Sequence, residues 1–231
     1  MTFLRNLYAS FVIFVSNFTA DFGAWVNFLL VVGLAALIIV MLARAILAGH
    51  TFRRHKPVAP PTPDEGLTER AAQSLSEAIR FATVTGDGEE MGRLIAYLKR
   101  RYAQAFAQMN LFELPAGSLL LRWRAAERKD APAPVLFCGH LDVVPPGEGW
   151  KTEPFSGARE DGVVRGRGAV DCKGPVIALL EAVSSLMEEG YAPRRDLYFA
   201  FGHDEELGGH DGAAVLADLL NKRGVFFDLI L

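Results

Sequence analysis

Cysteine and basic charge are both scarce in this chain of 231 residues. Cys138 and Cys172 are its only cysteines. This number excludes a disulfide framework, and we expect both thiols to be reduced and buried, as free cysteines usually are. The 24 Lys and Arg residues are outnumbered by 27 Asp and Glu residues, for a net charge of −3. Since there is also no base-reading motif, nucleic acid is not an expected partner.

Charged residues are absent from the stretch between Phe22 and Ala43. At about 1.5 Å per residue, a helix of this length crosses the hydrocarbon core of a bilayer. A buried core helix would normally show a polar face, and Asn27 is the only candidate for one. We therefore expect a single transmembrane helix over residues 22–47, with Trp25 at the interface and the lipid bilayer as a partner.

The segments on either side of this helix differ in composition. Residues 1–21 are apolar, but their uninterrupted part is too short to span a membrane. An interfacial segment, the first arm of a hairpin and a cleaved signal all remain open. Residues 48–67 are first basic and then proline-rich, which predicts a semi-rigid linker. The basic residues that follow the helix favour a cytoplasmic location for the rest of the chain.

The remainder, residues 68–231, shows alternating helical and strand patterns. We expect an α/β fold whose parallel-centred mixed sheet is flanked by helices, because strands and helices alternate along the chain. The periodicity of apolar residues predicts helices over 68–82, 90–106, 173–189 and 216–222, and strands over 119–124, 135–138, 197–201 and 226–231.

Three clusters in this region have the residues of a metal site. His140 and Asp142 follow one apolar run, Glu205 and Glu206 follow another, and Asp171 lies in a glycine-rich turn. Ligands of open α/β sheets bind beyond the carboxyl ends of the strands, where these clusters are expected. Taken singly, each has an ordinary alternative: a His-x-Asp is often surface or capping chemistry, and a Glu-Glu pair is often a solvated face.

Together the clusters indicate a two-metal hydrolytic site, in which a carboxylate deprotonates a metal-activated water. Asp171 is suited to bridge two metals through its two oxygens. The side chains of Glu205 and Glu206 should diverge, because they are neighbours. We therefore expect one of them to ligate a metal and the other to act as a base.

The motifs resemble a known family, the di-zinc aminoacylases and carboxypeptidases. This family includes glutamate carboxypeptidase, acetylornithine deacetylase and succinyl-diaminopimelate desuccinylase. The resemblance is strongest to the branch of carboxypeptidase S and N-fatty-acyl amino acid synthase/hydrolase. It covers about residues 68–231 and rests on HLDVVP at 140–145, Gly149-Trp150, PFSG at 154–157, Asp161-Gly162, GRGAVDCKG at 166–174, Pro193-Arg-Arg195 and GHDEELGG at 202–209.

The resemblance implies a role for each site residue and two zinc ions as cofactors, with cobalt or manganese as substitutes. It implies that His140 binds one zinc, Asp142 orients His140, Asp171 bridges the zincs, Glu205 is the general base and Glu206 binds the other zinc. It also implies a cis peptide bond between Asp171 and Cys172. We expect His203, Asp204 and His210 to lie outside the ligand set.

The chain departs from the family pattern at its end. In the family, an acidic ligand follows the strand that matches residues 226–231, and a His ligand lies beyond an inserted dimerisation domain. We expect this chain to be the amino-terminal portion of a longer enzyme, inactive or poor alone, whose homodimer would form through the missing domain. The resemblance favours a lumenal or extracytoplasmic side for the site, against the charge pattern.

The expected function is that of a membrane-anchored, zinc-dependent amidohydrolase or carboxypeptidase. Its substrates would be short peptides or N-acyl amino acids. The alternative is a truncated, catalytically incompetent membrane protein of the same fold.

Overall fold

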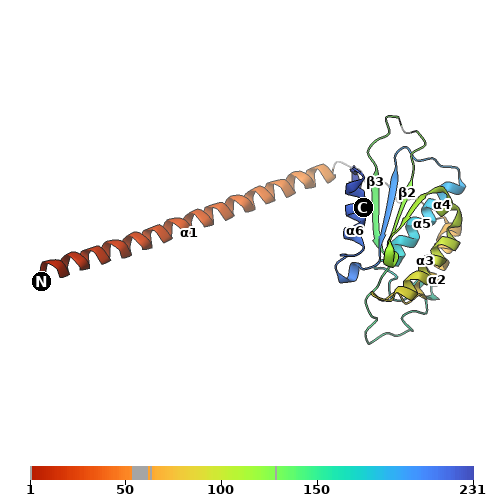
Figure 1. Ribbon diagram of the computed structural model, residues 1–231, viewed down its shortest axis with the longest axis horizontal. Helices are drawn as coiled ribbons and strands as arrows, with labels where there is room; N and C mark the ends of the chain where they lie inside the picture. The colour runs from red at the N-terminus through yellow and green to blue at the C-terminus, as the bar shows by residue number, and fades with distance from the viewer. Residues whose placement is uncertain (1, 54–61, 63, 128) are drawn as a thin grey trace. The chain divides into compact units, whose positions relative to one another are not determined.

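The computed structural model describes residues 2–53, 62, 64–127 and 129–231. The chain divides into two units, Met1–Pro61 and Thr62–Leu231. In the first unit, α1 is one continuous helix over Thr2–Arg53 (Figure 1). The hairpin alternative for residues 1–21 is therefore wrong.

Helix α1 contains a stretch, Ala24–Leu47, that is apolar and long enough to cross a membrane. The described side chains of this stretch are exposed. By length and composition it could serve either as a membrane anchor or as a signal sequence. Helix α1 and the next helix, α2 (Glu65–Ile79), extend into the two ends of the expected linker, and the prolines predicted to stiffen that linker lie outside the described residues.

The second unit contains a mixed five-stranded sheet. Its order is β1-β2-β6-β3-β7. Strands β6, β3 and β7 are parallel to one another, β2 is antiparallel to β6, and β1 is antiparallel to β2. The strands are β1 Asn110–Glu113, β2 Leu119–Trp123, β3 Val135–His140, β6 Leu197–Gly202 and β7 Leu229–Ile230. The predicted parallel-centred mixed sheet is confirmed.

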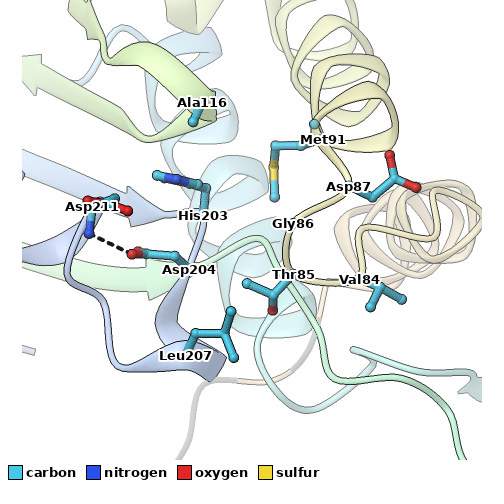
Figure 2. Close-up of a pocket in the computed structure, with 11 residues that line it drawn as sticks. Val84, Thr85, Gly86, Asp87, Met91, Ala116, His203, Asp204, Leu207 and Asp211 are labelled. Atoms are coloured by element: carbon cyan, nitrogen blue, oxygen red, sulfur yellow. Dashed lines mark hydrogen bonds between the residues drawn. The ribbon is translucent and has the colours of Figure 1, made fainter.

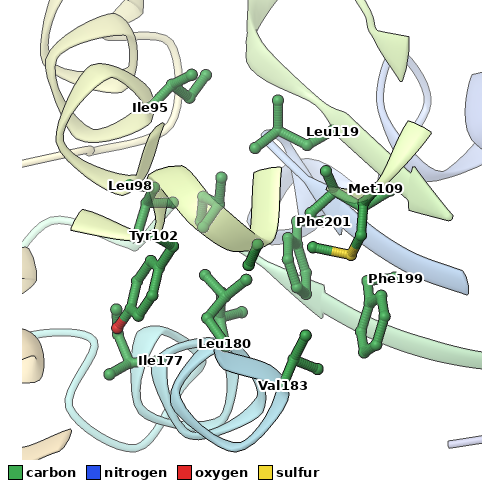
Figure 3. Close-up of a cluster of buried hydrophobic side chains, with 14 of the residues drawn as sticks. Ile95, Leu98, Tyr102, Met109, Leu119, Ile177, Leu180, Val183, Phe199 and Phe201 are labelled. Carbon is green, nitrogen blue, oxygen red and sulfur yellow. The ribbon is translucent and has the colours of Figure 1, made fainter. Parts of the chain in front are cut away.

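Strand β6 shows why helices cover both faces of this sheet. Its residues are apolar throughout, and successive side chains of a strand point to opposite faces. Phe199 and Phe201 pack against α5 (Lys173–Glu188) in the larger core cluster, as Figure 3 shows. Tyr198 and Ala200 pack against α6 (Ala213–Lys222) in the smaller one. A central strand buried on both faces needs such a continuous apolar run.

The helices of this unit lie close to their predicted positions. They are α2 Glu65–Ile79, α3 Gly88–Arg101, α4 Ala103–Gln108, α5 Lys173–Glu188 and α6 Ala213–Lys222. Asp64 and Asp87 cap α2 and α3 by accepting backbone N–H groups. The helix expected over 90–106 is divided at Tyr102, whose backbone is not helical and whose hydroxyl donates to the buried Glu181.

Several short elements escaped the sequence analysis. They are β1, the hairpin of β4 Ala158–Glu160 with β5 Val163–Arg165, and two 3₁₀ helices, η1 Pro115–Gly117 and η2 Glu205–Leu207. The prediction that both cysteines are buried is wrong. Cys138 is exposed and Cys172 is partly buried. On the α6 face of β3 the apolar cluster includes Leu136 but does not reach Cys138.

Candidate metal centre

The register of two parallel strands creates the candidate site. Strands β3 and β6 pair so that His140 lies opposite Gly202, and Leu141 N donates to Gly202 O at 2.9 Å. The residues that follow each strand therefore meet at the carboxyl edge of the sheet. Asp142 and Glu205, 63 residues apart in the sequence, become hydrogen-bonding neighbours.

His140 is buried and held through both ring nitrogens. Nδ1 lies 3.0 Å from the carbonyl oxygen of Asp142 and 3.3 Å from its Oδ1, while Nε2 lies 2.8 Å from Asp171 Oδ1. Burial lowers the pKa of His140, but its hydrogen bonds with Asp142 and Asp171 raise the pKa more, to about 10. A metal that binds Nε2 would take the place of its hydrogen bond with Asp171, because imidazole ligates through a nitrogen that carries no proton.

Asp142 connects all the strand-end residues of the site. It is fully buried, and its Oδ2 accepts a hydrogen bond from Thr85 Oγ1 at 2.8 Å. The backbone N–H groups of Glu205 and Glu206 donate to Oδ1 and Oδ2, each at 3.2 Å. Burial raises the pKa of Asp142, but these bonds and that of His140 outweigh it and lower the pKa. One ionised carboxylate thus positions His140 and both glutamates.

Asp171 comes from the turn that precedes α5. Gly166 and Gly168 have positive φ angles, and the peptide bond between Asp171 and Cys172 is cis, as expected. The side chain of Asp171 is 76% exposed. A Cβ on Gly174 would lie 2.1 Å from Ala169 O, so only glycine lets the turn pack against the start of α5.

Lys173 fixes this turn to the end of α2. Its side chain is buried, and Nζ donates to Phe81 O at 2.6 Å and to Ala78 O at 3.2 Å. Burial lowers the pKa of Lys173 to about 7, although the Glu90 carboxylate acts in the opposite direction. Neither Lys173 nor Thr85 could be predicted from the sequence as part of the site, because their partners come from segments distant in the sequence.

Glu205 and Glu206 lie in η2, directly after β6. Glu205 Oε2 is 3.9 Å from His140 Nε2, and its side chain is 59% exposed. One oxygen from each glutamate and one nitrogen of His140 lie within 4.8 Å of one another. The expectation that the two carboxylates diverge is therefore wrong, because the tight 3₁₀ turn brings both toward His140.

The other polar residues of this segment lie outside both donor groups found in the described residues. His203 Nδ1 is 2.7 Å from Ser118 Oγ, and Asp204 Oδ2 accepts a hydrogen bond from Asp211 N at 2.7 Å. His203, Asp204 and Asp211 line a cavity of 210 Å³ together with Thr85 and Leu207 (Figure 2). The cavity shares Thr85 with the Asp142 hydrogen-bond network.

The donors fit a divalent metal. His140 belongs to two groups of donor atoms within 4.8 Å, one with Glu205 and Glu206 and the other with Asp171 and Cys172. Imidazole nitrogen, carboxylate oxygen and thiolate sulfur are the ligands of zinc in proteins. The structure thus brings together all five residues that the sequence analysis named: His140, Asp142, Asp171, Glu205 and Glu206.

The chain is similar in sequence to curated carboxypeptidase S-like proteins and to N-fatty-acyl-amino acid synthase/hydrolases. The chain is 38% identical over 152 residues to probable carboxypeptidase S-like 2 of Dictyostelium discoideum, covering 62% of this chain and 29% of the relative. It is 31% identical over 208 residues to an N-fatty-acyl-amino acid synthase/hydrolase of Xenopus tropicalis, covering 87% and 41%. The chain thus spans less than half the length of these two curated relatives.

Solved structures share the fold of the second unit. A metallo-carboxypeptidase of Sulfolobus solfataricus superposes with a TM-score of 0.56 at 23% identity, covering 73% of this chain and 37% of that one. Human carnosine dipeptidase 1 does so with a TM-score of 0.50 at 26% identity, covering 67% and 35%. Residues 136–231, which contain all five site residues, match the model of peptidase family M20/M25/M40, so this part of the chain is a peptidase M20 domain.

Proposed function

We propose that the chain forms part of a membrane-anchored, metal-dependent amidohydrolase of the carboxypeptidase kind. Its substrates would be short peptides or N-acyl amino acids. The observation that carries the proposal is the meeting of His140, Asp171, Glu205 and Glu206 at one edge of the sheet, within 4.8 Å in two overlapping groups. The names of the relatives, which include carboxypeptidases and an N-fatty-acyl-amino acid synthase/hydrolase, support this substrate class.

In this proposal each protein group has a separate task. His140, Asp171 and Glu206 would hold two zinc ions, with Asp171 between them. A bound metal of this kind supplies Lewis acidity, which polarises an amide carbonyl and makes water more acidic. Asp142 keeps the His140 ring in one orientation, as the carboxylate partner of a ligating histidine does.

Glu205 would be the general base. Its carboxylate is largely exposed, so a water molecule can reach it, and it lies 3.9 Å from His140 Nε2. The carboxylate would take a proton from the attacking water and pass it to the departing amine, so that the amide C–N bond breaks without releasing a strongly basic anion. The hydrogen bond from Glu205 N to Asp142 fixes the backbone that carries this group.

The test combines metal content and turnover for the whole chain in detergent. N-acyl amino acids and dipeptides are the substrates, and release of the amino acid is measured. We expect Glu206→Gln to lose bound zinc. We expect Glu205→Gln to keep its zinc and to lower whatever turnover the parent chain shows by at least a hundredfold, the lower range for removing a general base. A Glu205→Gln variant with full activity would contradict the assigned role, and a parent chain without zinc would contradict the metal site.

Membrane anchoring and the side of the membrane are parts of the same proposal. The apolar stretch Ala24–Leu47 supports anchoring, and the basic residues after it favour a cytoplasmic site. Accessibility of Cys138 to a membrane-impermeant maleimide in sealed vesicles decides the side, because this thiol is exposed.

A further inference from the structure

Cys172 lies beside the candidate metal centre and has no part in the function proposed above. It is the residue between Asp171 and the buried Lys173, directly before the first turn of α5. Its Sγ, one oxygen of Asp171 and one ring nitrogen of His140 lie within 4.8 Å of one another. The thiol is thus the third donor of a group that already contains two of the proposed ligands.

The local backbone brings this sulfur close to strand β3. A Cβ on Gly139 would lie 3.5 Å from Cys172 Sγ and 2.8 Å from a methyl carbon of Val176. Because Gly139 has no side chain, α5 and the thiol can approach the strand next to His140. Cys172 as a residue is only partly buried, and it packs at the edge of the larger core cluster.

The spacing of the donors suits a tetrahedral ion. Zinc binds sulfur at about 2.3 Å and imidazole nitrogen at about 2.0–2.1 Å, so two such donors at the tetrahedral angle lie about 3.5 Å apart. The nitrogen of His140 and the oxygen of Asp171 are 2.8 Å apart, a hydrogen-bond distance that would lengthen by about 0.5 Å if both bound one zinc. Because Cys172 Sγ lies within 4.8 Å of both donor atoms, a side-chain rotation that moves the sulfur by about 1 Å would bring it near this spacing.

We propose that Cys172 is a ligand of the metal ion held by His140 and Asp171, which rests on the metal site of the proposed function. The sulfur binds as a thiolate, and its proton passes to solvent as the metal–sulfur bond forms. The two ions of the proposed centre then differ in chemistry: the ion held by His140 has nitrogen, oxygen and sulfur donors, and the ion held by Asp171 and Glu206 has oxygen donors from these residues. A thiolate favours Zn²⁺, Co²⁺ or Cd²⁺ over Mn²⁺ at its position.

Cobalt spectroscopy of the whole chain in detergent tests the proposal directly. Co²⁺ bound to a thiolate has an intense near-ultraviolet charge-transfer absorption, whereas Co²⁺ with only nitrogen and oxygen donors has weak visible bands. We expect the intense band in the parent, its loss in Cys172→Ser and its retention in Cys138→Ser. The Cys138 variant is the matched control, because it removes the other thiol of the chain and leaves the donor group complete.

The outcomes separate this inference from the function beneath it. If the parent binds cobalt without the intense band, or if Cys172→Ser keeps the band, ligation by Cys172 is overturned. The metal site itself is not affected by either outcome. A parent chain that binds no cobalt overturns the metal site and this inference together.

Thiol protection gives a second measurement that needs no variant. With iodoacetamide and peptide mass spectrometry, we expect zinc to slow alkylation of Cys172 at least tenfold and to leave that of Cys138 unchanged, because a metal-bound thiolate is withdrawn from reaction. Equal rates for Cys172 with and without bound zinc would overturn the proposal.

Discussion

Replacing Asp142 with asparagine should weaken metal binding, although the two side chains have nearly the same shape. The Asp142 carboxylate accepts hydrogen bonds from Thr85 Oγ1, Glu205 N and Glu206 N, and His140 Nδ1 lies beside it. An amide has only one acceptor oxygen. Whichever way it turns, its NH₂ group faces the backbone N–H of one of the two glutamates.

The size of the effect follows from this count. A buried N–H group left without an acceptor costs about 1–3 kcal/mol, so the folded state should lose stability by about that amount. Loss of the carboxylate partner of a ligating histidine typically weakens metal binding about 10–100-fold, which corresponds to about 1.4–2.8 kcal/mol. Urea unfolding measures the first quantity, and competition with a chromophoric zinc chelator measures the second.

Asp196 provides the matched control. It accepts hydrogen bonds from Arg122 and from Ala125 N at the opposite end of the sheet. Asp196→Asn should lower the free energy of unfolding and leave zinc affinity unchanged. If Asp142→Asn bound zinc as tightly as the parent, within threefold, Asp142 would not position the ligands, and the reasoning would be wrong.

Three further predictions concern the packing of the second unit and the apolar helix. Gly174→Ala should destabilise the fold and reduce zinc content, because its Cβ would lie 2.1 Å from Ala169 O. The control is Gly92→Ala in α3, where a Cβ meets open space; this variant should keep its zinc and have a higher melting temperature. Equal behaviour of the two variants would contradict the packing argument. Glu181→Ala should lower the free energy of unfolding by about 3 kcal/mol, because it leaves Arg101 without its carboxylate partner. This value of about 3 kcal/mol is the low end for breaking a buried ion pair. A change under about 1 kcal/mol in urea unfolding would refute this estimate. Leu37→Arg, near the middle of Ala24–Leu47, should increase the fraction of molecules released from membranes by alkaline carbonate extraction. A charge at the centre of a transmembrane helix costs about 3 kcal/mol. Unchanged retention would argue against a spanning helix.

The positions of the site residues could be predicted from the sequence because each follows a strong local signal. The apolar runs that became β3 and β6 end directly before His140 and the segment of Glu205 and Glu206. Parallel strands bring such ends together, so no long-range information was needed. The glycines around Asp171 indicated a tight turn in the same way.

The supporting residues could not be predicted, because their roles depend on tertiary contacts. Thr85 lies in the loop between α2 and α3 and reaches Asp142 only because residues 83–85 run beside residues 141–143. Lys173 looks like an exposed charge at the start of a helix, yet it is buried against the end of α2. Strands β4 and β5 have three residues each, too few for an alternating pattern.

The pairing of β3 with β6 has a consequence for the time at which the site can form. Asp142 and the backbone of Glu205 meet only after the 63 residues from position 143 to Glu205, which include all of α5, have been synthesised and the chain has closed into a loop. During translation His140 therefore exists for some time without its glutamate partners. Since a metal that binds only the folded state stabilises that state by mass action, ion loading should follow strand pairing and then oppose its reversal.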